Sequence, residues 1–290
     1  VDDEKELFKL ANSKYIQSDT GGIYRVVRER LGAGYWVLFS GCPCQVAALY
    51  GVLGTRRDNK RLITVEVVCH GIAGQEALDL HLHHYNSNRI YSFRDKHLGT
   101  QNWEFSQCTT IEIDGHPHKL ARKQDVFYAI YSGWLLDRMS CSNCQYASIE
   151  RVADISLADF WGLSVPEYYK QGVSLIMTNN MKADTFVKAA DNVYVFKEAL
   201  TTAIGGNPHL FTGYKFIKYH PMVVAPEIMK KILPASLRFA ILTNRMPHKL
   251  FWAIFKIATM LHIKYQKNKL IRRLYNDKSL SHLLIKPNRG

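Results

Sequence analysis

The chain has 290 residues, of which 47% are hydrophobic and 22% charged, a composition typical of a globular protein and not of a disordered one. This length allows one large domain or two smaller ones. No run of 18 apolar residues occurs and the first residues are acidic, so neither a membrane span nor a signal peptide is predicted and we expect a cytoplasmic protein. The chain does not begin with Met and opens like the interior of a domain, so we expect an upstream N-terminal segment to be missing.

The net charge of +13 is concentrated in the last quarter of the chain. Residues 215–290 hold 16 Lys and Arg and only two acidic residues, whereas residues 1–214 are close to neutral. Within this tail, residues 250–263 are apolar except for one lysine and are too short to span a bilayer. The tail predicts contact with an anionic membrane surface, at the inner membrane face, or with an acidic partner, unless it packs on its own domain. Nucleic-acid binding is not expected, because the tail has no recognisable reader motif.

Hydrophobic periodicity predicts alternating helices and strands in the first two thirds of the chain. Helical spacing occurs in residues 5–11, 23–31, 45–53, 74–85, 127–136 and 181–190, and strand character in residues 36–40, 62–68, 90–93, 153–162 and 173–178. Residues 103–114 predict an antiparallel meander, with Asp114-Gly115 as a hairpin turn. The order strand, helix, strand in residues 36–68 predicts a βαβ unit with a parallel crossover. The expected fold class is therefore α/β, with a mixed sheet.

Six cysteines are too few for a disulfide scaffold of this size, and in a reducing compartment metal or redox chemistry explains them better. Cys42 and Cys44 lie in the turn between the first strand and its helix, where unpaired amide N–H groups favour thiolate over thiol. Cys69 follows the second strand, so parallel pairing of the two strands would bring Cys44 and Cys69 to one sheet edge. Residues 141–144 form a Cys-x-x-Cys loop, a common way to present two thiolates to one centre.

Four thiolates from three segments can bind a structural zinc or an iron-sulfur cluster. Because two of them come singly from strand ends, a cluster held by the fold is favoured over a small zinc module. Cys108 has no cysteine neighbour in the meander and is interpreted as structural. His81, His83 and His84 do not share one helical face, so they are interpreted as solvated.

Six motifs, in order across residues 13–162, carry a resemblance to a known family. They are Ser13-Lys14-Tyr15-Ile16-Gln17-Ser18, residues 39–49 around Gly41-Cys42-Pro43-Cys44-Gln45, Val68-Cys69-His70-Gly71, Phe93-Arg94-Asp95-Lys96, Cys141-Ser142-Asn143-Cys144, and residues 154–162. In these motifs the chain resembles the beta subunit family of coenzyme F420 hydrogenases and dehydrogenases. That family includes plant 7-hydroxymethyl chlorophyll a reductase and bacterial members found with exopolysaccharide synthesis genes.

The resemblance implies an FAD-binding domain over residues 1–200, with a 4Fe-4S cluster near the flavin, and a basic, mainly helical C-terminal region over residues 201–290. It assigns four cysteines to the cluster, namely Cys44, Cys69, Cys141 and Cys144. It assigns nine residues to the flavin, namely Ser13, Lys14, Tyr15, Gln17, Gln45, His70, Arg94, Asp95 and Lys96.

The resemblance leaves the roles of two pairs of residues open. Arg94 and Lys96 would stabilise the reduced flavin or its pyrophosphate, or else form ordinary surface ion pairs with Asp95. Asp159 and Trp161 would have a functional role, or else mark a buried strand end.

The function implied is that of an oxidoreductase that passes electrons between a two-electron donor or substrate, such as coenzyme F420 or a flavin, and a one-electron ferredoxin-type carrier or partner subunit. Polysaccharide biosynthesis is the implied setting. The chain lacks the upstream Cys-x-x-Cys-x-x-Cys segments of many family members, which implies a separate ferredoxin-type partner or a missing N-terminal portion. The family more often has Thr at the position of Cys42, so the role of this thiol is left open. The alternative is a non-catalytic scaffold of a surface-polysaccharide assembly that holds zinc.

Overall fold

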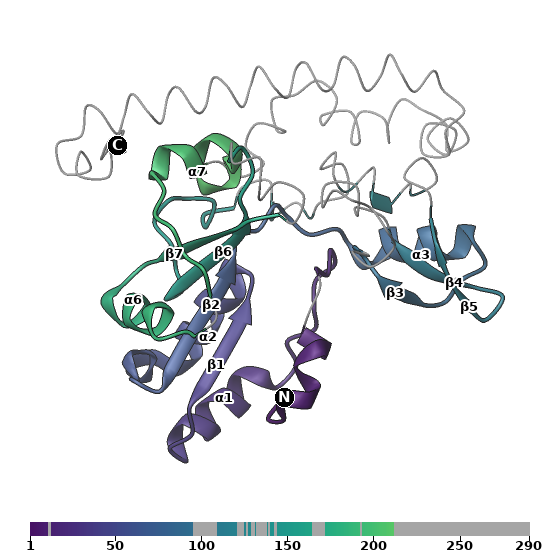
Figure 1. Ribbon diagram of the computed structural model, residues 1–290. Helices are drawn as coiled ribbons and strands as arrows, with labels where there is room; N and C mark the ends of the chain where they lie inside the picture. The colour runs from purple at the N-terminus through teal and green to yellow at the C-terminus, as the bar shows by residue number, and fades with distance from the viewer. Residues whose placement is uncertain are drawn as a thin grey trace.

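The computed structural model describes residues 1–10, 13–94, 109–120, 144–163, 172–191 and 193–211, together with residues 125, 127–128, 131, 138 and 140–141. These residues contain two sheets (Figure 1). The larger sheet has the order β1 (Val37–Gly41), β2 (Leu62–Val67), β6 (Ile155–Asp159), β7 (Ser174–Thr178). The smaller one is antiparallel and consists of β3 (Ile90–Ser92), β4 (Thr110–Ile113) and β5 (His116–Lys119).

The larger sheet contains the predicted βαβ unit. β1 and β2 pair in parallel, with Val37 opposite Leu62 and Gly41 opposite Glu66, and α2 (Pro43–Leu53) connects them. β6 continues the parallel part of the sheet, whereas β7 runs antiparallel to β6. The expectation of an α/β fold with a mixed sheet is therefore confirmed.

Helices cover both faces of this sheet. On one face α1 (Ile23–Gly32) and α2 pack on Phe39 and Leu62, with Leu49 fully buried between them. On the other face α6 (Met181–Lys188) packs Ala183 against Ile63 and the β6 residue Ile155. β2 is therefore covered on both sides, as expected of the apolar, β-branched run in its sequence.

The smaller sheet has a core of its own. Ile111 of β4 packs with Leu78 and Leu82 of α3 (Gln75–His84) and with Phe127. The turn between β4 and β5 has positive φ at Asp114 (51°) and Gly115 (78°), as a type I′ turn requires. The predicted hairpin is therefore confirmed.

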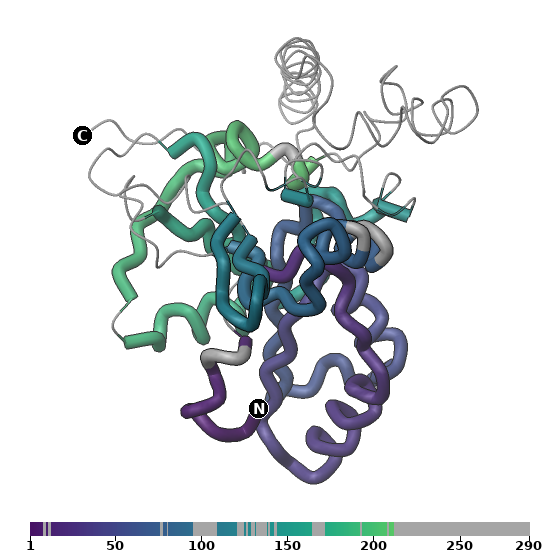
Figure 2. Tube along the Cα trace, turned by 90° about the vertical axis from the view of Figure 1, so that its right-hand side faces the viewer, coloured from purple at the N-terminus to yellow at the C-terminus, as the bar shows by residue number. Residues whose placement is uncertain are grey.

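A third cluster lies at the carboxyl ends of β2 and β6. It contains Val68 and Phe160 together with residues of α7 (Leu200–Gly206) and of the 3-10 helix η5 (Pro208–Leu210). Seen from the side, the slate-purple segment with α1, β1 and α2 lies on the right, and the green segment with α6 and α7 lies on the left (Figure 2). This arrangement agrees with β1 and β7 forming the two edges of the sheet.

Several element predictions need correction or stay open. The helix expected at residues 5–11 is the 3-10 helix η1 (Glu4–Leu10), and a second 3-10 helix, η2 (Gly54–Asp58), follows α2. The tail from residue 212, Cys108 and most of the helix predicted at 127–136 lie outside the described residues. Among the described residues, no helix is long and apolar enough to cross a membrane.

Candidate functional site

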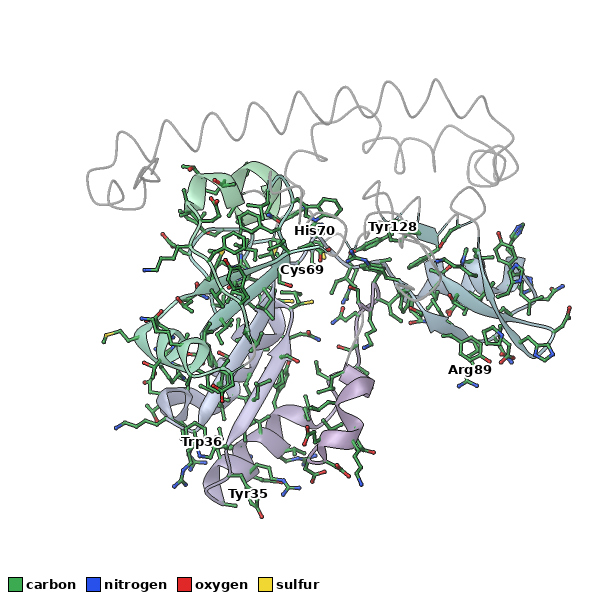
Figure 3. All side chains as sticks on the ribbon, viewed as in Figure 1. Tyr35, Trp36, Cys69, His70, Arg89 and Tyr128 are labelled. Carbon is green, nitrogen blue, oxygen red and sulfur yellow. The ribbon has the colours of Figure 1, made fainter. Side chains whose placement is uncertain are left out.

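The carboxyl ends of β1 and β2 bring two cysteines to one edge of the sheet. Gly41 ends β1 and is followed by the Cys42-Pro43-Cys44 turn, and β2 is followed by Cys69. Figure 3 places Cys69 and His70 at this end, and Tyr35 and Trp36 at the opposite end of the sheet. The pairing of β1 with β2, on which the predicted neighbourhood of Cys44 and Cys69 depended, is thus present.

The turn before α2 is held by a capping interaction. Cys42 is the N-cap residue and Pro43 starts the helix; the Cys42 N–H donates to Gln45 Oε1 at 2.8 Å. The Gln45 Nε2 in turn donates to Ser18 Oγ at 2.9 Å. Gln45, a predicted flavin contact, therefore ties the cysteine turn to the Ser13–Ser18 loop.

The Cys-x-x-Cys loop is attached to the segment that follows Cys69. The Arg138 N–H donates to the Ile72 carbonyl at 3.0 Å, and the Cys141 N–H donates to the Arg138 carbonyl at 2.8 Å. The Cys144 N–H then donates to the Cys141 carbonyl at 3.3 Å, which closes the loop. These backbone bonds bring the loop to the sheet edge that carries Cys69.

The four cysteines are electrostatically coupled. Partial burial of the otherwise exposed Cys44 raises the pKa of its thiol, and the nearby thiols of Cys69, Cys144 and Cys141 raise it further, so the lowered pKa expected at the start of α2 is not found. Among the residues that the structure describes, no group of three or more His, Cys, Asp or Glu side chains could hold a single metal ion. Soft sulfur ligands whose negative charges repel one another fit a cationic iron-sulfur centre, which would relieve that repulsion.

A loop preceding α1 adds an aromatic side chain to the same region. Ile16 forms a parallel bridge with Ala73, and the Ala73 N–H donates to the Tyr15 carbonyl at 3.3 Å. The Tyr15 ring lies 4.4 Å from that of Tyr131 and 5.7 Å from that of Tyr128, centroid to centroid. Burial raises the pKa of the Tyr15 hydroxyl, whereas Arg94 and a hydrogen bond with Ser13 act to lower it. Three of the predicted flavin residues, Ser13, Tyr15 and Arg94, therefore gather in one place.

An ion pair joins the two sheets beside Tyr15. Arg94, just beyond β3, donates from Nη1 to Asp159 Oδ2 at 2.7 Å, and Asp159 ends β6. The Arg94 side chain is 6% exposed and that of Asp159 is 36% exposed. Burial acts to lower the pKa of Arg94, but the charge and hydrogen bond of Asp159, together with Tyr15 and Tyr128, outweigh burial and raise it. Asp159 is therefore a carboxylate partner of Arg94, and the alternative pairing with Asp95 stays untested because Asp95 and Lys96 lie outside the described residues.

His70 meets a second histidine that the sequence did not indicate. Its ring stacks on that of His209 in η5, with centroids 4.1 Å apart and an interplanar angle of 23°. Burial lowers the pKa of His70 to about 4, although Asp159 acts to raise it. Burial also lowers the pKa of His209, and His70 lowers it further. The only signal for His209 in the sequence is a single histidine in a short loop, which carries no periodicity.

The remaining predicted residues have simpler positions. Lys14 and Gln17 are exposed on the loop that carries Tyr15. His83 and His84 are exposed as expected, but His81 is buried and lies 3.9 Å from Asp125, so the prediction of solvation is wrong for His81. His81 follows Leu78 by three residues and therefore faces the same core.

The protein has an α/β fold, and four cysteines and the Arg94–Asp159 ion pair lie toward the carboxyl edge of its larger sheet. Residues 35–202 match the family described as the C terminus of the coenzyme F420 hydrogenase/dehydrogenase beta subunit. The match covers more than half of the chain, and the chain belongs to this family, whose members are oxidoreductase subunits. No curated protein matches the chain.

Proposed function

We propose that this protein is an FAD- and 4Fe-4S-dependent oxidoreductase that passes electrons between a two-electron donor or substrate, such as coenzyme F420 or a flavin, and a one-electron ferredoxin-type carrier. The observation that carries the proposal is the coupling of Cys44, Cys69, Cys141 and Cys144, which come from three distant segments, at one sheet edge. Membership of the F420 hydrogenase/dehydrogenase beta subunit family supports it.

In this proposal the four cysteines hold the cluster. Backbone bonds between segments far apart in the chain, from Arg138 to Ile72 and between β1 and β2, keep the cysteines at one edge of the sheet. Cys44 is exposed, and the other three are only partly buried. A cluster held there would therefore lie near the surface, within reach of an electron carrier.

The flavin in this proposal occupies the adjacent polar region. Arg94 supplies a fixed positive charge, and Asp159 holds the guanidinium in place. Tyr15 supplies an aromatic face, and Gln45 and Ser18 supply amide and hydroxyl groups. Lys14, Gln17, Asp95 and Lys96 belong to the same proposed set. A bound flavin would exchange electrons in pairs with the donor and singly with the cluster.

The wider setting is proposed from the sequence alone. A ferredoxin-type partner or partner subunit would receive or supply single electrons, and the basic region 201–290 would contact an anionic membrane surface at the inner face of the cell membrane. Residues 1–200 would form the flavin domain. A role in polysaccharide biosynthesis would fit the bacterial members that the chain resembles.

Anaerobic purification followed by metal, sulfide and flavin analysis tests the proposal. We expect about four iron and about four sulfide per chain, together with bound FAD and a brown colour. Cys69→Ser and Cys144→Ser should each lose most of the iron while the chain stays folded.

Three results would contradict the proposal: a colourless protein with neither iron nor flavin, iron that persists in both cysteine variants, or stoichiometric zinc without flavin. The last of these would favour the zinc-holding scaffold. Circular dichroism of each variant distinguishes loss of the cofactor from loss of the fold.

A further inference from the structure

The segment 200–211 covers the strand ends that carry the candidate site. Ile204 and Leu210 are 1% and 0% exposed, and they pack in one cluster with Val68 and Phe160. Val68 immediately precedes Cys69, and Phe160 immediately follows Asp159. The segment therefore contacts the residues on either side of the candidate site, although the family match ends at residue 202.

A close backbone contact fixes this segment. A Cβ atom at Gly206 would lie 1.5 Å from the Trp161 carbonyl oxygen and 2.9 Å from the Gly162 nitrogen. No side chain fits such a space, so the end of α7 can approach the turn after β6 only because residue 206 is glycine. This contact sets where the next residues, including His209, enter the site.

His209 is enclosed where the segment meets His70. It is 2% exposed, and its ring lies nearly parallel to that of His70 at a centroid distance of 4.1 Å. A ring stacked at this distance contacts one face of the His70 imidazole and limits its rotation toward η5.

We propose that His209 is a positioning residue of this site, which stacks on His70 and thereby fixes the His70 ring beside Cys69. This proposal rests on the proposed function, because its effect is measured as the reduction potential of the iron-sulfur centre that the cysteines would hold. Groups just outside the ligands of an iron-sulfur centre tune its reduction potential through their polarity, orientation and exclusion of water. His209 would therefore act on this potential through His70, without touching the centre itself.

A mutant cycle tests the proposal on the full-length, anaerobically purified protein. His209→Phe keeps a flat ring that can stack, whereas His209→Leu keeps similar bulk without a planar face. Each is made alone and together with His70→Ala, and His83→Leu, at an exposed histidine on α3, is the matched control. The midpoint potential of the iron-sulfur centre is measured by visible absorbance during reductive titration, and unfolding is measured by circular dichroism.

We expect His209→Leu to change the equilibrium constant for one-electron reduction of the centre about tenfold, which is a shift of about 59 mV in its midpoint potential. His209→Phe and His83→Leu should leave the potential unchanged. In the His70→Ala background, His209→Leu should have no further effect, because the ring that it positions is gone. A purely structural role would instead shift the potential equally with Phe and Leu, or by the same amount in both backgrounds, and either result would overturn the proposal.

The unfolding measurements separate this proposal from the proposed function. If the unaltered protein holds no iron, the proposed function fails and no potential can be read. The stacking contact can still be measured from stability. If the two rings are coupled, the double variant should lose a different amount of unfolding free energy from the sum of the losses in His209→Leu and His70→Ala. Additive effects would show that the two rings are not coupled, and that result overturns the positioning role with or without a cofactor.

Discussion

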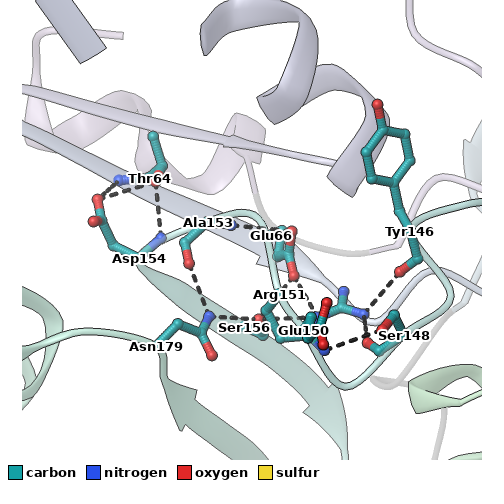
Figure 4. A network of polar contacts seen from close by, with 10 residues as sticks. All are labelled: Thr64, Glu66, Tyr146, Ser148, Glu150, Arg151, Ala153, Asp154, Ser156 and Asn179. Atoms are coloured by element: carbon teal, nitrogen blue, oxygen red, sulfur yellow. Dashed lines mark hydrogen bonds and ion pairs between the residues drawn. The ribbon is translucent and has the colours of Figure 1, made fainter. Parts of the chain in front are cut away.

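Two ion pairs that join distant segments of this protein differ in what surrounds them. Glu66 lies in β2 and Arg151 in the segment that precedes β6, with side chains 0% and 1% exposed and Oε1 and Nε 2.5 Å apart (Figure 4). Arg94 and Asp159 lie at the carboxyl edge, where Asp159 is 36% exposed. The first pair is enclosed by protein, whereas the second has one side open to solvent.

Most polar atoms of the enclosed pair make hydrogen bonds; within the part of the chain that the structure describes, Arg151 Nη2 is buried without a partner. The Glu66 Oε1 also accepts from Ser156 Oγ at 2.8 Å, and Oε2 accepts from the Ala153 N–H at 3.3 Å. Arg151 Nη1 donates to the carbonyls of Tyr146 and Ser148, at 3.1 and 2.9 Å. The pair therefore links residues 146–151, which follow Cys144, to β2, the strand that precedes Cys69. It supports the candidate site without lining it.

The difference between the pairs separates support from function. A buried ion pair contributes little net stability by itself, but breaking it leaves a charge without compensation. A half-open pair loses less when broken, because water can solvate the remaining charge. We therefore expect the enclosed pair to control folding and the open pair to control cofactor binding.

The largest expected effect is that of Glu66→Gln. The amide would place a donor where Arg151 and Ser156 both donate, and it would leave the buried guanidinium uncompensated, which costs about 3–5 kcal/mol. Unfolding in guanidinium chloride, followed by circular dichroism, measures this loss of stability. The double variant Glu66→Met/Arg151→Met should recover part of it, because it removes both charges. A single variant within about 1 kcal/mol of the unaltered protein would contradict the assignment.

The second prediction concerns the open pair. Arg94→Met should reduce retained FAD at least tenfold, because it removes a charge-assisted donor worth about 1.5–3 kcal/mol. The loss of unfolding free energy should stay near 1 kcal/mol, since the partner carboxylate is partly solvated. Flavin released by acid from purified protein measures the effect. Arg89→Met, at an exposed arginine beside β3 that lies over Tyr91, is the matched control and should retain full FAD.

Parts of the fold that depend on local pattern could be predicted from the sequence. The apolar runs before Cys44 and Cys69, with a helix between them, predicted a parallel pair, and the pairing of Val37 with Leu62 follows it. The Asp114-Gly115 turn was predictable because few residue pairs accept two positive φ angles. In both cases the information lies within a few residues of the feature.

Other parts depend on contacts between residues far apart in the chain. Asp159 is 65 residues from Arg94, and His209 meets His70 only because α7 docks on the turn after β6. No local periodicity marks such partners, so the sequence indicates Arg94 and Asp159 separately but not their pairing, and it indicates His70 without His209. The enclosed pair was missed for the same reason, since a lone Glu66 in an apolar strand gives no indication of Arg151.

A third prediction compares charges near Asp154, a neighbour of the enclosed pair. Burial acts to raise the pKa of Asp154, but bonds from Asn180, the Thr64 N–H and Lys182 outweigh burial and lower it. A lowered pKa contributes stability that is present above about pH 4 and is lost as the pH falls through the folded-state pKa. Lys182→Met should therefore cost about 1 kcal/mol at pH 7 and clearly less at pH 3.

Urea unfolding at the two pH values measures this difference. Lys188→Met, on the same helix, breaks the exposed pair with Asp184 and should cost about 0.5 kcal/mol or less at pH 7. An equal cost for Lys182→Met at pH 7 and pH 3 would show that its charge does not stabilise ionised Asp154.

The smallest expected effect is that of Cys42→Ser, which sharpens the comparison at the open edge. Cys42 is the N-cap of α2, and its N–H is already satisfied by Gln45. Serine is a preferred N-cap residue, so this variant should be as stable as the unaltered protein or more stable by up to about 1 kcal/mol, with unchanged iron. Cys44→Ser, two residues away, should lose most of its iron. If Cys42→Ser loses iron to the same extent, Cys42 is a ligand, and the division of this turn into one capping and one ligating cysteine is wrong.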